Sequence, residues 1–104
     1  MAWVKVAPLA AIPVGEARAV RVGLDDLLVC RPADQVVHVL EDVCSHDEAA
    51  LGSQTLDGTV VTCPRHGARF DIATGAVLRS PAVVGIAAYP ARITGQWVEA
   101  ELED

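Results

Sequence analysis

Two short pairs of metal-binding side chains stand out in this chain of 104 residues. The first pair is Cys44 and His46, and the second is Cys63 and His66. Sixteen residues separate His46 from Cys63. Each pair supplies one thiolate and one imidazole, so the four side chains offer two sulfur and two nitrogen donors. These residues are the candidate metal ligands.

An equal mixture of thiolate and imidazole points to one of two kinds of metal centre. Structural zinc sites gather their ligands around a single ion, commonly through pairs such as Cys-x-x-Cys. In a two-iron centre, each loop can place its Cys on one iron and its His on the other, as in a Rieske [2Fe–2S] cluster. The spacing favours the two-iron centre, and a zinc-binding interaction module without sulfide is the alternative.

The chain resembles the Rieske family over nearly its whole length, and it is most similar to small soluble Rieske-type ferredoxins. The resemblance rests on Cys-x-His, a gap of sixteen residues and Cys-x-x-His, followed by Gly67. Three further segments also look like this family: residues 56–61, 70–75 and 80–82.

That resemblance implies a location for each ligand. Cys44 and Cys63 would bind the inner iron of one [2Fe–2S] cluster. His46 and His66 would bind the outer iron, near the surface. Pro81 would lie in a loop that covers the cluster. The implied fold is an antiparallel β-sandwich with a small cluster-binding subdomain inserted, in a single domain of residues 1–104 whose cluster-binding section is about 43–81.

The strand pattern independently favours an all-β fold, because short β-like segments alternate with turn signals along the chain. A four-residue turn is predicted at 23–26, and one turn of helix at 47–51. The last hairpin is predicted from strands 83–93 and 96–102. Further strands are predicted at 3–6, 17–22, 27–31, 36–40, 59–62 and 69–72.

Composition narrows the classes of partner and compartment. The net charge of −6 argues against nucleic acid and against an anionic membrane surface. The longest apolar run, residues 82–91, is about half of a membrane span of ~20 residues. No secretory signal is recognisable, because Pro8 and Pro13 interrupt the N-terminal apolar stretch. We therefore expect a cytoplasmic protein that binds neither membrane nor nucleic acid, and a monomer is the simplest expectation.

Two potential ligands lie outside the paired motif. Cys30 stands in an apolar run and is expected to be a small core residue. His38 lies between valines and is expected at the surface or the edge of the core rather than at a metal.

The residues around the second pair predict a low reduction potential. High-potential Rieske proteins of cytochrome bc complexes carry a Ser and a Tyr where this chain has Ala68 and Phe70, and neither of these can donate a side-chain hydrogen bond. Those proteins also carry a disulfide-forming Cys in each ligand loop, where this chain has Ala49 and Arg65. Arg65 and Arg69 flank His66 and are candidate partner contacts.

The resemblance implies an electron carrier rather than an enzyme. Four ligands saturate the cluster and leave no open position for a substrate. The expected partners are a flavin-dependent, NAD(P)H-oxidising ferredoxin reductase and a terminal Rieske non-haem iron oxygenase of aromatic hydrocarbon catabolism. The oxygenase itself needs a second iron site, for which 104 residues leave no room. The alternative is a small Rieske-like subunit of an assimilatory nitrite reductase.

Overall fold

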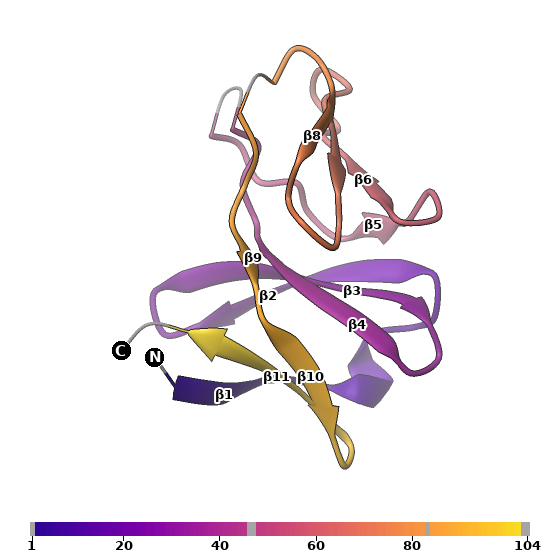
Figure 1. Cartoon of the computed structure of the whole chain (residues 1–104), viewed down its shortest axis with the longest axis vertical. Helices are drawn as coiled ribbons and strands as arrows, with labels where there is room; N and C mark the ends of the chain where they lie inside the picture. The colour runs from indigo at the N-terminus through magenta and orange to yellow at the C-terminus, as the bar shows by residue number, and fades with distance from the viewer. Residues whose placement is uncertain (1, 46–47, 83, 103–104) are drawn as a thin grey trace.

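The computed structural model describes residues 2–45, 48–82 and 84–102, and the elements in these ranges are β-strands apart from one short 3₁₀ helix. The strands form three antiparallel sheets, stacked along the longest axis of a molecule measuring 38 × 29 × 18 Å (Figure 1). In chain order the elements are β1 Ala2–Pro8, η1 Leu9–Ala11, β2 Glu16–Val22, β3 Asp25–Ala33, β4 Val36–Glu41, β5 Gln54–Thr55, β6 Val60–Thr62, β7 Arg69–Asp71, β8 Val77–Arg79, β9 Ala88–Tyr89, β10 Ala91–Thr94 and β11 Trp97–Leu102.

Each sheet draws on a different part of the chain. The terminal sheet has the order β1-β11-β10, and the central sheet has the order β5-β2-β3-β4-β9. The small sheet, β6-β7-β8, comes from residues inserted between β4 and β9 of the central sheet. In Figure 1 the terminal sheet is at the bottom and the small sheet at the top. The predicted all-β sandwich with an inserted subdomain is therefore confirmed.

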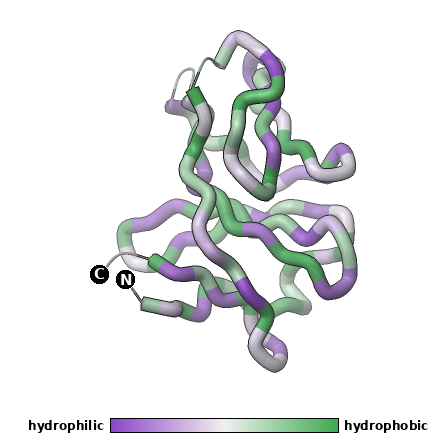
Figure 2. The backbone as a smooth tube through the Cα atoms, viewed as in Figure 1, coloured by the Kyte–Doolittle hydropathy of each residue, from purple (hydrophilic) through white to green (hydrophobic). Residues whose placement is uncertain are grey.

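Strand β3 of the central sheet is buried on both faces, since successive side chains of a strand point to opposite sides and here both sets are covered. Along β3, Leu27 and Val29 face the terminal sheet, whereas Leu28 and Cys30 face the small sheet. These four residues are fully buried. Figure 2 shows hydrophobic and hydrophilic positions alternating along several other strands of the lower half, as expected where only one face is buried. One face of the central sheet therefore packs against the inserted section.

Most of the predicted strands are confirmed, with small changes at their ends. The turn between β2 and β3 is shorter than predicted, because Val22 pairs directly with Asp25 and leaves a two-residue loop. Gly23 takes a positive φ of 60° as the first loop residue, as in a type II′ hairpin turn. The helical turn predicted at 47–51 is not present in residues 48–51, and Asp47 lies outside the described residues.

The long strand predicted at 83–93 is wrong. Residues 84–87 form no strand, and Val83 lies outside the described residues. Pro90 then divides the segment in two, because proline cannot donate a hydrogen bond to a sheet ladder. β9 before it joins β4 of the central sheet, and β10 after it joins β11 of the terminal sheet. The apolar run therefore connects two sheets instead of extending one.

Candidate metal centre

The first ligand loop follows β4 and closes on itself through backbone hydrogen bonds. The amide of Cys44 donates to the carbonyl of Ala49 at 2.7 Å, and the amide of Glu48 donates to the carbonyl of Cys44 at 2.7 Å. The Asp42 carboxylate accepts a 2.9 Å bond from the amide of Gly52 and closes the wider segment. Cys44 is thereby held at a tight turn although no partner strand lies beside it.

The second ligand loop, residues 63–68, is the tip of the β6–β7 hairpin and repeats the same pattern. The amide of Cys63 donates to the carbonyl of Ala68 at 2.7 Å, and the amide of Gly67 donates to the carbonyl of Cys63 at 3.0 Å. The fourth residue after each cysteine has a left-handed backbone, with φ of 78° at Gly67 and 61° at Glu48. Two segments of different sequence therefore form the same kind of loop.

The two cysteines are brought into one apolar core, whereas His66 is exposed. Cys44 and Cys63 are 0% and 1% exposed, they form no disulfide, and both belong to the core between the central and small sheets. Phe70 and Ile72 of the same core are fully buried. His66 lies on the surface of the second loop. His46, the remaining predicted ligand, lies outside the described residues.

A third loop, between β8 and β9, packs against the ligand section. Ser45 donates a hydrogen bond from its Oγ to the carbonyl of Val84 in this loop, at 2.5 Å. On its other side, the amide of Ile86 donates to the carbonyl of Gly75 at 2.9 Å. A Cβ on Gly75 would stand 2.0 Å from the Ile86 carbonyl oxygen, so only glycine permits this approach. Pro81 lies in the same loop, after a cis peptide bond.

The side chain of Gln54 is hydrogen-bonded to β6, the strand that precedes Cys63. Its side-chain amide accepts a 2.9 Å bond from the amide of Thr62 and donates a 3.0 Å bond to the carbonyl of the same residue. This pair of bonds copies one rung of a β-ladder along β6, which has β7 as its strand partner. Sequence analysis did not identify Gln54, Ser45 or Gly75, because their roles depend on contacts with residues distant in the sequence.

Neither Cys30 nor His38 is part of this site. Cys30 is fully buried in β3, and burial, with a smaller contribution from the charge of Asp42, raises the pKa of its thiol to about 12. A thiol of such high pKa stays protonated near neutral pH, which suits a core residue. His38 lies directly across from Cys30 on β4 and is half-buried. Both predictions for these residues are confirmed.

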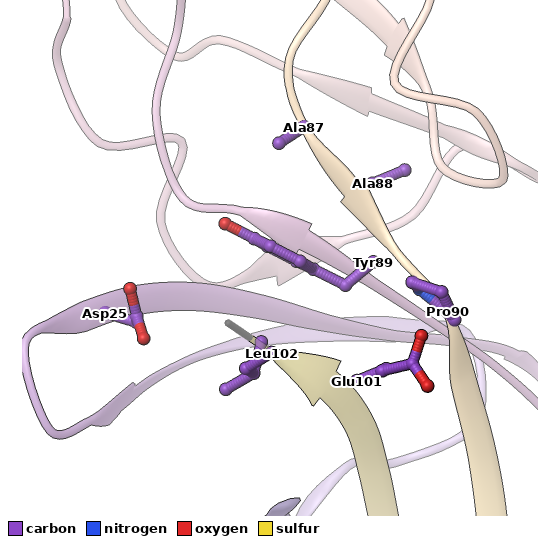
Figure 3. Close-up of a pocket in the computed structure, with 7 residues that line it drawn as sticks. All are labelled: Asp25, Ala87, Ala88, Tyr89, Pro90, Glu101 and Leu102. Carbon is purple, nitrogen blue, oxygen red and sulfur yellow. The ribbon is translucent and has the colours of Figure 1, made fainter. Parts of the chain in front are cut away.

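Two hollows in the surface contain no Cys or His. One, of about 330 Å³, lies where the central and terminal sheets meet, with Tyr89 and Pro90 on one side and Glu101 and Leu102 on the other (Figure 3). A second, of about 340 Å³, shares Asp25 and Tyr89 with it and reaches the first ligand loop. The second is lined by five carboxylates: Asp25, Asp26, Glu41, Asp42 and Glu48.

The residues present fit a two-iron cluster. Two buried thiols that form no disulfide lie in one apolar core, each at the start of a closed loop, and suit inner ligands, whereas an exposed imidazole suits an outer one. In the described ranges, no three Cys, His, Asp or Glu side chains converge so as to hold a single metal ion.

Comparison with known proteins identifies the family. Residues 2–90 match the Rieske [2Fe-2S] domain. Ferredoxin CarAc of Metapseudomonas resinovorans is 38% identical over 92 residues, which cover 88% of this chain and 85% of that protein.

Solved structures agree with this match. The ferredoxin of carbazole 1,9a-dioxygenase from Nocardioides aromaticivorans IC177 superposes with a TM-score of 0.88 at 31% identity, over 99% of this chain and 100% of that one. A chain from the complex of reduced oxygenase and oxidized ferredoxin in carbazole 1,9a-dioxygenase superposes with a TM-score of 0.83 at 36% identity, over 97% of each chain. The chain therefore belongs to the Rieske family and is a Rieske-type ferredoxin, an electron carrier with one [2Fe–2S] cluster.

Proposed function

We propose that this ferredoxin passes single electrons from a flavin-dependent, NAD(P)H-oxidising reductase to a terminal Rieske non-haem iron oxygenase. The observation that carries the proposal is the match, over nearly the full length of both chains, to ferredoxins of dioxygenase systems. One of the solved structures is a complex of reduced oxygenase and oxidized ferredoxin in carbazole 1,9a-dioxygenase. The small subunit of a nitrite reductase has no comparable support among these relatives.

Cys44, His46, Cys63 and His66 are the proposed cluster ligands, with the cysteines on the inner iron and the histidines on the outer iron. Burial of both cysteines and exposure of His66 support this assignment of ligands to the inner and outer iron. When bound, the cluster accepts and releases one electron, at a potential raised by its two neutral imidazoles. The chain excludes water from the thiol side through its apolar core and leaves the imidazole side open to a partner.

The cluster is proposed to work at a low potential, towards the lower end of the range of about −150 to +300 mV found for Rieske centres. Ala68, the last residue of the second ligand loop, and Phe70 of β7 are fully buried and have no hydroxyl that could donate to the sulfurs. Hydrogen bonds to sulfur stabilise the reduced cluster, so their absence lowers the potential.

The remaining proposals concern the whole molecule. Residues 1–104 are proposed to form one domain, with residues 43–81 as its cluster-binding section. The terminal sheet supports this, because it pairs β1 from one end of the chain with β11 from the other. We propose a cytoplasmic monomer that binds neither membrane nor nucleic acid. Among the described residues, no helix has the length and hydrophobicity needed to cross a membrane.

Electron delivery to an oxygenase tests this function. The ferredoxin is reduced with one equivalent of electrons, mixed anaerobically with an oxidised terminal oxygenase of a carbazole 1,9a-dioxygenase system, and followed by visible absorbance. Reoxidation of the ferredoxin together with reduction of the oxygenase supports the proposal. Electron transfer to no oxygenase tested contradicts the proposed function, and a midpoint potential clearly above zero contradicts the proposed low potential.

A further inference from the structure

Two arginines lie directly opposite each other in the small sheet, close to the second ligand loop. Arg69 of β7 pairs in register with Arg79 of β8. Side chains paired in this way lie on one face with Cβ atoms about 4.5–5.5 Å apart, and like charges so placed repel each other. The pair therefore destabilises the isolated sheet unless an anion compensates it.

Only one of these two charges is compensated by a residue that the structure describes. Arg69 forms an ion pair with the carboxylate of Asp57. Arg79 is exposed and has no ion pair or hydrogen bond from its side chain to any residue in the described ranges. In a chain of net charge −6, an uncompensated cation beside a second cation is available to an anionic partner.

An apolar side chain stands beside the two arginines. The register of β7 and β8 shifts between Arg69 and Phe70, so that Leu78 is an extra residue on β8. Bulges of this kind redirect side chains, and Leu78 is 53% exposed. Together with Val60, it lines a shallow hollow of about 270 Å³ whose other walls are Arg69 and Arg79.

A charge on an edge strand is often explained as protection against aggregation. β8 is an edge of the small sheet, so Arg79 alone would serve that purpose. Protection requires neither a second arginine opposite it nor an exposed leucine next to it. A hollow that combines two guanidinium groups with apolar walls has instead the composition of a protein-binding surface, where arginine is enriched.

The position of this hollow relates it to electron transfer. Arg69 begins β7 three residues after His66, the exposed proposed ligand. A protein that exchanges electrons through the His66 edge must cover the surface around the second ligand loop, and β7 and β8 lead directly away from that loop (Figure 1). We propose that the Arg69–Arg79 hollow is a docking contact that receives an acidic side chain, flanked by an apolar one, from the terminal oxygenase. This inference rests on the proposed function, because it identifies how that partner is held.

Removing the charge of Arg79 should change docking to the oxygenase without changing the properties of the cluster. Arg79→Gln removes the charge, keeps a polar side chain and leaves the Arg69–Asp57 pair intact. The matched control is Arg21→Gln, which removes the same charge from an exposed ion pair of 3.8 Å on the central sheet, where 64% of the arginine side chain is accessible. For both variants we expect the EPR spectrum and the midpoint potential of the wild-type protein.

Docking is measured by stopped-flow transfer from reduced ferredoxin to the oxygenase of a carbazole 1,9a-dioxygenase system, with the ferredoxin concentration varied. At low ionic strength, Arg79→Gln should raise the half-saturating concentration about three- to tenfold, and Arg79→Glu should raise it further, while the rate at saturation stays unchanged. The effect of Arg79→Gln should shrink as salt is added. Leu78→Asn should weaken docking with a salt dependence like that of the wild type.

Three results would overturn the inference. Half-saturating concentrations for Arg79→Gln and Arg79→Glu equal to that of the Arg21→Gln control would show that the hollow does not bind the oxygenase. Slower reduction by a flavin-dependent reductase, with transfer to the oxygenase unaffected, would assign the hollow to the other partner. If the reduced wild-type protein transfers electrons to no oxygenase, the proposed function itself fails, and this inference fails with it.

Discussion

Glu48 and Gly67 hold the same left-handed backbone conformation at the same position of the two ligand loops, four residues after Cys44 and Cys63. Glycine adopts this conformation readily, whereas other L-residues are destabilised in it by about 1–2 kcal/mol. Among the described residues, Glu48 is the one non-glycine residue with a positive φ. The first loop is therefore strained at a position where the second is not.

Glu48→Gly should stabilise the protein. Relief of the strain exceeds the extra entropy that glycine gives the unfolded chain, so we expect the free energy of unfolding to rise by about 0.5–1 kcal/mol. Urea denaturation of the holoprotein measures this. Glu48→Ala removes the same carboxylate but keeps the strain, and it should give no such gain. Equal stability of the two variants would show that the backbone at Glu48 is not strained.

Gln54→Glu should weaken the strand that carries Cys63. The carboxylate can still accept the hydrogen bond from the amide of Thr62, but it cannot donate to the Thr62 carbonyl. Leaving that carbonyl without its donor should lower the free energy of unfolding by about 1–3 kcal/mol and speed loss of the visible absorbance of the cluster under a chelator. Gln35→Glu, on an exposed turn, makes the same chemical change and serves as control. If the cluster absorbance decays at the same rate in both variants, the hydrogen bonds of Gln54 to Thr62 do not stabilise the site.

Ser45→Ala should loosen the contact between the first ligand loop and the loop after β8. The lost hydrogen bond to the Val84 carbonyl contributes about 0.5–1.5 kcal/mol, so bleaching of the cluster by a chelator should become several-fold faster. Ser45→Thr keeps the hydroxyl and should restore the wild-type rate. Failure of threonine to restore it would show that the hydroxyl does not hold the two loops together.

Burial of Cys30 predicts a specific dependence of stability on pH. Because its pKa rises from 9.0 to about 12 on folding, the unfolded chain releases the thiol proton first, so stability should fall as the pH increases from 9 towards 12. Denaturant midpoints measured across the lower part of this window should fall more steeply for the wild type than for Cys30→Ala. Parallel curves would mean that the thiol ionises as readily in the folded protein as in the unfolded one.

Most of the regular elements could be predicted from the sequence, and the proposed ligand positions were chosen from it, because both depend on local patterns. Alternating polar and apolar residues marked β2, and the spacing of Cys and His marked both ligand loops. β5 and β8, which are only two and three residues long, were missed because so few residues carry no periodic signal.

Contacts between distant segments could not be predicted in this way. Nothing local to Gln54 indicates that its amide pairs with Thr62, and nothing local to Arg79 indicates that Arg69 lies opposite it. The left-handed backbone at Glu48 is one that residues other than glycine rarely adopt, so its neighbours in the sequence do not predict it. Such residues follow from the closed loops around the cluster and not from their neighbours in the sequence.

The central claim, that Cys44, His46, Cys63 and His66 hold a Rieske cluster, is tested most directly by EPR. The protein is reduced with dithionite, and its iron and acid-labile sulfide are measured on the same sample. We predict equal iron and sulfide, with an average g-value below that of ferredoxins with four cysteine ligands. An EPR-silent protein that contains zinc and no sulfide would contradict the account and leave a zinc-binding module in its place.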